Sequence, residues 1–117
     1  MTAKNDLEIR MEPDGSTIHV RGIVDQLSGP DLRGFLQSQV GDVDQLTVDL
    51  TDVQVLLAAG LRELDAGLRI VRDRGALVVV HAPEGSMAHR VMDVARRVGT
   101  QPAQGYVTAP AAGYADA

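Results

Sequence analysis

In residues 46–64, LTVDLTDVQVLLAAGLREL, the spacing of apolar residues changes from that of a β-strand to that of a helix. Leu46, Val48 and Leu50 alternate with polar residues, which is typical of a β-strand. Further along, apolar residues recur at the spacing of one helix face, namely at Leu61, Leu64, Leu68 and Val71. The stretch therefore predicts a strand, a short connection, and a helix that begins within two or three residues of Ala59.

The start of this helix lacks a capping residue. Ser, Thr, Asp or Asn normally accept hydrogen bonds from the free N–H groups of a first turn, and losing such a residue costs about 0.5–2 kcal/mol. Leu57, Ala58 and Ala59 stand there instead. Alanines also begin helices in ordinary α/β proteins, so the missing cap does not by itself indicate a function. The neighbouring sequence is needed to interpret it.

The sequence before this stretch predicts a hairpin and a helix. Apolar alternation in residues 7–11 and 18–20 flanks the turn signal PDGS at residues 13–16. A helix follows, with Ser28 as a candidate cap and with an apolar stripe formed by Leu32, Phe35, Leu36 and Val40. The hairpin strands are expected to be antiparallel.

The sequence after this stretch predicts a strand, a third helix and a last short strand. Residues 76–80, ALVVV, are continuously apolar, so this strand is expected at the sheet centre, covered on both faces. The third helix has a predicted stripe of Met87, Val91, Val94, Ala95 and Val98. Residues 106–108 could add a strand.

The order of these elements predicts the fold class. Two strands, then helix, strand, helix, strand and helix, give a single α/β domain with a mixed sheet of four to five strands and about three helices. This domain is expected to span residues 1–108. The segment after Gly99 is rich in Ala, Gly and Pro, and residues 109–117 are expected to form a disordered tail.

Composition excludes several classes of function. The 117 residues contain no cysteine, so disulfide and thiolate chemistry are absent, and one Phe and two Tyr form no stacking platform. The net charge of -5 disfavours nucleic acid as a partner. Without a leader-like or long apolar segment, we expect a cytoplasmic protein with no direct membrane insertion. Ten of the eleven basic residues are Arg, which suggests a GC-rich bacterial source.

The sequence contains none of the common catalytic motifs. The sequence has no Gly-rich phosphate loop, no G-x-S-x-G turn and no H-E-x-x-H pair. His19, His81 and His89 share no ligand spacing. Asp25 and Asp49 form a candidate carboxylate pair at one sheet edge, although turn-forming roles are favoured. We therefore expect no enzyme activity, no cofactor and no metal site.

Three segments together resemble the STAS domain of bacterial anti-sigma factor antagonists. They are VRGIVDQLSGPDLRGFL, LTVDLTDVQVLLAAGLREL and RGALVVVHAP, and the resemblance covers residues 7–99. Residues 22–25 match a G-E-L-D-like turn, and residues 48–53 match a hydrophobic-D-L-S/T-x-V segment. Residues 57–61 align with the D-S/T-x-G-L motif at a helix start.

The resemblance implies a protein-interaction role in transcription regulation by partner switching. In the family, a kinase-like anti-sigma factor phosphorylates a hydroxyl in the last motif and binds the unmodified surface. Here Leu57 replaces the acid, while Ala58 and Ala59 replace both hydroxyls. The resemblance thus implies a non-phosphorylatable module. Ser28, Thr51 and Ser86, which lie near helix starts or in loops, are alternative phosphorylation candidates, although capping is the favoured role there.

The predicted partner surface combines the loop after the third strand with the first turns of the second helix. It comprises Asp25, Thr51, Asp52, Leu57, Ala58, Ala59, Gly60, Leu61 and Arg62. The expected partner is an anti-sigma factor or another regulatory protein, and homodimerisation is left open. Alternatives are an accessory subunit of a membrane transport ATPase and, ranked last, a nucleotide- or small-molecule-binding domain.

Overall fold

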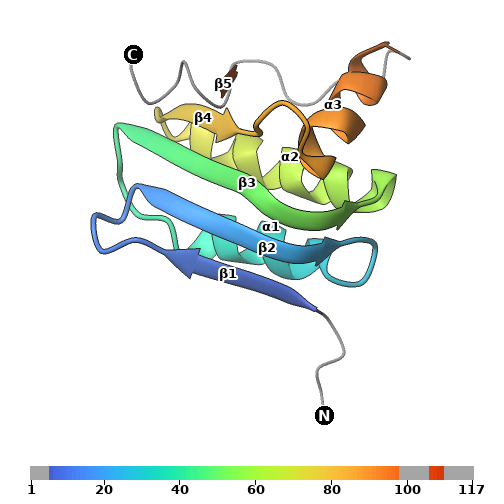
Figure 1. Cartoon of the computed structure of the whole chain (residues 1–117). Helices are drawn as coiled ribbons and strands as arrows, with labels where there is room; N and C mark the ends of the chain where they lie inside the picture. Colours follow the sequence, from blue (N-terminus) through green and yellow to red (C-terminus); the bar gives the residue numbers. More distant parts are fainter. Residues whose placement is uncertain (1–5, 98–105, 110–117) are drawn as a thin grey trace.

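The structure is a computed structural model that describes residues 6–97 and 106–109. Along the chain its elements are β1 (Leu7–Met11), β2 (Thr17–Val24), α1 (Gly29–Ser38), β3 (Gln45–Leu56), α2 (Ala58–Asp73), β4 (Leu77–His81), α3 (Met87–Arg97) and β5 (Tyr106–Ala109). Figure 1 shows α1 and α2 side by side behind the sheet. The predicted α/β class, with a mixed sheet and three helices, is confirmed.

The five strands lie in the order β1-β2-β3-β4-β5. β1 is antiparallel to β2, and every other neighbouring pair is parallel, as the predicted hairpin and helical crossovers require. β5 ends at Ala109, one residue beyond the predicted strand. The remaining residues of the predicted tail, 110–117, lie outside the described part of the chain.

The central strand is β3, so the prediction that residues 76–80 form the sheet centre is wrong in position. β4 lies between β3 and β5, with Val78, Val79 and Val80 all buried. Leu77, at the start of β4, is exposed. The continuous apolar run therefore indicated a strand covered on both faces, but not the middle of the sheet.

β3 is longer than the sequence predicts. It continues through residues 51–56, which were expected to be a connection. Its pairing with β2 shifts twice, between the partners of His19 and Arg21 and between those of Gly22 and Ile23, and each shift inserts one extra residue into β3. Because a β-bulge breaks the alternation of side chains, it hides the second half of the strand from a periodicity analysis.

The core is aliphatic and lies between the sheet and the two helices behind it. The predicted stripe of α2 is buried along its whole length, at Leu61, Leu64, Leu68 and Val71. Leu32 and Leu36 of α1 are fully buried, and Leu36 packs where Gly67 leaves room on α2. Small residues at this contact let the two helices approach each other closely.

α3 presents a different face to the core than the sequence predicts. Ala88, Met92 and Ala95 are buried, whereas Val94 is 56% exposed. The helix lies beside the second half of β3, which runs on past the end of β4 (Figure 1). The predicted stripe is only partly right: Ala95 is buried and Val91 is half-buried, but Ala88 and Met92, which were not predicted, are buried beside them. Val98 lies outside the described residues.

Gly60 and Gly34 offer a matched test of helix packing. A Cβ on Gly60 would lie 2.3 Å from the carbonyl oxygen of Val24, whereas a Cβ on Gly34 of α1 would meet nothing within 4 Å. We expect Gly60→Ala to lower the free energy of unfolding by about 1–3 kcal/mol through overpacking. Gly34→Ala should raise it by about 0.5–1 kcal/mol, because alanine has the higher helix propensity. Urea titrations of both variants measure the difference, and equal effects would contradict the close approach.

Candidate functional site

The carboxyl end of β2 is closed by a turn built on Asp25. Its carboxylate accepts hydrogen bonds from the backbone N–H of Leu27 at 2.9 Å and of Ser28 at 3.0 Å. The Ser28 N–H is the largest influence on the Asp25 carboxyl, and its bond outweighs the opposing effect of burial, so the pKa lies below the ordinary value. The turn leaves the Leu27 side chain 70% exposed.

The start of α2 is fixed against the same end of β2. The backbone N–H of Leu57 donates to the carbonyl of Val24 at 2.9 Å, and Gly60 lies directly against that residue. Leu57 occupies the capping position with an extended backbone and gives no side-chain cap. Its side chain is 48% exposed. Two leucines that flank the end of β2 are therefore exposed on a rigid junction.

The residues predicted to contact a partner fall into two groups. Thr51 and Asp52 are exposed, but they lie in β3 on the far side of the second bulge. At about 3.3 Å per residue, Asp52 is roughly 13 Å along the strand from Leu56. Thr51 and Asp52 are therefore separate from the helix start.

The second group lies at the helix start. Leu57, Ala58 and Arg62 are exposed there, Asp25 and Ala59 are half-buried, and Gly60 and Leu61 are buried. Leu27, which the sequence analysis missed, joins this group; the available signal was a large apolar residue in a connecting loop. We call Leu27, Leu57, Ala58 and Arg62 the end surface.

The three alternative hydroxyls differ in accessibility. Ser28 is buried, with its hydroxyl donating to the carbonyl of Ile23 at 2.7 Å, and it gives no side-chain cap to α1, so the predicted capping role is wrong. The reason is that this hydroxyl is held by the end of β2. Ser86 accepts a hydrogen bond from the N–H of His89 at 3.1 Å and so caps α3. Thr51 is exposed.

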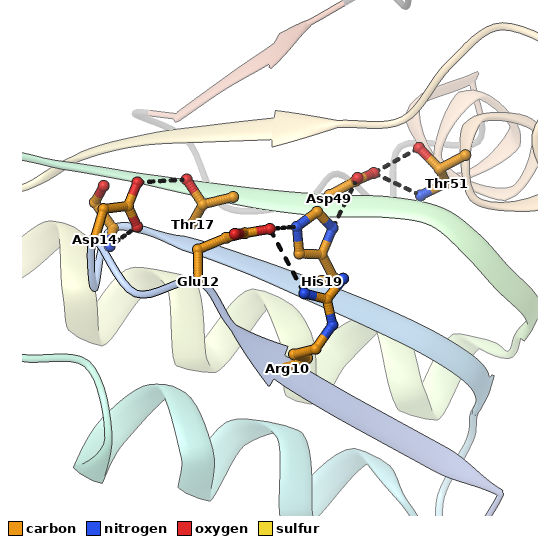
Figure 2. Close-up of polar contacts among 8 residues, drawn as sticks. Arg10, Glu12, Asp14, Thr17, His19, Asp49 and Thr51 are labelled. Carbon is orange, nitrogen blue, oxygen red and sulfur yellow. Dashed lines mark hydrogen bonds and ion pairs between the residues drawn. The ribbon is translucent and has the colours of Figure 1, made fainter.

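A cluster of polar side chains lies on the sheet face opposite α1 and α2, and it joins β2, β3 and the residue that follows β1. Figure 2 shows His19 of β2 between Glu12 and Asp49. The His19 Nδ1 lies 3.0 Å from Asp49 Oδ2, and its Nε2 lies 2.5 Å from Glu12 Oε2. The Thr51 hydroxyl donates to Asp49 Oδ1 at 2.5 Å. Because a neutral imidazole has one N–H, His19 donates to both carboxylates only when its ring is protonated.

Asp49 is the centre of this cluster. It pairs in register with His19 on one side and with His81 on the other. Burial works to raise the pKa of its carboxyl, but the hydrogen bonds from Thr51 and the two nearby imidazoles outweigh that effect, so the pKa lies below 3.8. The hypothesis that Asp49 and Asp25 share one sheet edge is wrong, because Asp49 lies in the middle of β3.

The described part of the chain contains no group of three or more His, Cys, Asp or Glu side chains arranged to hold a metal ion.

A shallow surface hollow is lined by Arg21, Thr51, Asp52, Val53 and Gln54. No helix in residues 6–97 is long and apolar enough to cross a membrane.

Comparison of the chain with protein-family models and with curated proteins gives no match.

Asp49→Asn tests the role of the cluster in stability. The folded pKa of Asp49 is depressed, so its contribution to folding is full above the unfolded value near 3.9 and is lost as the pH falls through the folded pKa. At neutral pH we expect the variant to lose about 1 kcal/mol of unfolding free energy, because Thr51 and His19 lose a charged acceptor. Towards pH 2 the difference should shrink. Urea unfolding across the acid range measures this, and a difference that is constant with pH would contradict it.

Proposed function

We propose that the chain is a non-catalytic protein-interaction module of the kind found in anti-sigma factor antagonists, and that it docks a regulatory partner through the end surface. The observation that carries this proposal is the exposure of Leu27 and Leu57 on a junction held by backbone hydrogen bonds. Exposed apolar groups on a rigid support lose little conformational entropy when a partner covers them. The resemblance to STAS domains, which places the partner contact at the same helix start, supports the choice of surface.

The absence of a hydroxyl at the helix start makes docking independent of phosphorylation there. Ala58 and Ala59 have no acceptor atom for a phosphoryl group. Ser28, the nearest hydroxyl in the β2–α1 turn, is buried and bonded to the backbone. The proposed module is therefore constitutively competent, acts in the cytoplasm in transcription regulation, and needs no cofactor.

A second candidate within the same proposal is an accessory subunit of a membrane transport ATPase. The end surface would serve either role, because both require docking of one folded protein on another. The protein that co-purifies from the native cell separates the two: an ATP-binding anti-sigma factor favours the first role, and a transporter ATPase favours the second. A nucleotide-binding role ranks last, because the sequence lacks a phosphate-binding loop.

Ala58→Asp is expected to affect folding and binding in opposite directions. Aspartate near a helix start can accept hydrogen bonds from free N–H groups and meets the positive end of the helix dipole, worth about 0.3–1 kcal/mol. A charge buried without a partner should instead weaken docking by about 2–5 kcal/mol, or roughly thirty-fold to several thousand-fold in affinity. A melting curve and a titration with the recovered partner measure the two effects.

Val94→Asp is the matched control. Val94 is also an exposed apolar residue, but it lies on α3 and is not part of the end surface. Its substitution should leave affinity unchanged. If Ala58→Asp is well folded and binds as tightly as the control, the end surface is not the docking site.

A further inference from the structure

β1 is an edge strand whose outer backbone groups face away from the sheet. Within the described residues it pairs with β2 alone. Two cross-strand bonds fix the pattern: Glu12 donates to the carbonyl of Thr17 at 2.8 Å, and Ile23 donates to the carbonyl of Asp6 at 3.3 Å. These bonds lie at opposite ends of the β1–β2 ladder. Both residue pairs, Glu12 with Thr17 and Asp6 with Ile23, are therefore hydrogen-bonded pairs of the antiparallel pattern.

The alternation determines which residues of β1 have outward backbone groups. In an antiparallel pair, residues that exchange hydrogen bonds alternate with residues that do not. Counting from the bonded residues Asp6 and Glu12, Glu8 and Arg10 exchange bonds with β2. The N–H and C=O groups of Leu7, Ile9 and Met11 therefore point outward along the free edge.

The sequence of β1, Leu-Glu-Ile-Arg-Met, is complementary to itself when reversed. In an antiparallel pair centred on Ile9, Glu8 lies opposite Arg10 of the second copy, and Leu7 lies opposite Met11. Ile9 faces its own counterpart, and all three outward residues fall in hydrogen-bonded pairs. Glu8 and Arg10 then fall in the non-bonded pairs, where opposing side chains are closest and charge pairing is most effective.

The two faces of β1 suit this pairing. Glu8 and Arg10 have side chains 64% and 63% exposed, and among the described residues each makes one ion pair, at the long distance of 3.7 Å. On the other face, Leu7, Ile9 and Met11 are only partly buried and pack against the core. A second copy of β1 would therefore place opposite charges next to Glu8 and Arg10 on one face. On the other face it would cover part of the apolar surface that Leu7, Ile9 and Met11 leave exposed.

We infer that β1 is a homodimer interface, in which two copies pair β1 antiparallel about a twofold axis through Ile9 and form one continuous sheet. This inference does not depend on the proposed function, because β1 contributes no residue to the end surface. A five-residue strand pair is a small interface, so the dissociation constant should be on the order of micromolar.

Amide hydrogen exchange followed by NMR at several protein concentrations tests the pairing residue by residue. In the full chain, exchange at Leu7, Ile9 and Met11 should slow as concentration rises towards about 1 mM, in step with dimer formation seen by sedimentation. Exchange at Glu8 and Arg10 should be slow throughout, because β2 protects these amides. A chain that stays monomeric over this range, or a dimer in which Ile9 still exchanges rapidly, would overturn the inference.

Charge substitutions test the register. Arg10→Glu brings two carboxylates together at each of the two symmetric positions and should weaken the dimer at least ten-fold. The double variant Glu8→Arg with Arg10→Glu restores opposite charges and should return the dissociation constant to within about three-fold of the original. Melting curves check that each variant is folded. A single variant that dimerises normally, or assemblies larger than a dimer, would contradict a twofold pairing that uses each β1 once.

Discussion

The contact between the last residue of β2 and the first turn of α2 sets the position of every residue at that end of the molecule. The carbonyl of Val24 accepts a hydrogen bond from Leu57, and only the absence of a side chain at Gly60 lets the helix come this close. On its other side, the end of β2 is held by the hydroxyl of Ser28, which bonds to Ile23. The junction is therefore fixed by backbone groups and one buried hydroxyl, so the placement of its exposed leucines does not depend on exposed side chains.

Most of the architecture could be predicted from local periodicity. The α2 stripe and the hairpin follow directly from apolar spacing, and both are present in the structure. The length of β3 could not be predicted this way, because its two bulges are defined only relative to β2. The face of α3 was ambiguous for a different reason: its apolar residues form two overlapping stripes, and only packing beside β3 selects the one containing Met92.

The candidate sites were less predictable, because they depend on residues that are distant in the sequence. Glu12, His19 and Asp49 belong to different segments, and only the strand register brings them together. Leu27 was missed since a loop leucine has no periodic neighbours to mark it as exposed. The helix start, in contrast, lies at Ala58, within the predicted two or three residues of Ala59, because its connection to the preceding strand is short.

The geometry of the two proposed surfaces determines how they could act together. β1 lies at the sheet edge, while the end surface lies at the carboxyl ends of β2 and β3. Because the twofold axis reverses strand direction, β2 of one copy runs antiparallel to β2 of the other in the extended sheet. The two end surfaces therefore face opposite ways, at opposite ends of the dimer. Such a dimer can hold two partners at once, but it cannot place both end surfaces on one compact partner, so dimerisation would bridge two partner molecules without strengthening the binding of either.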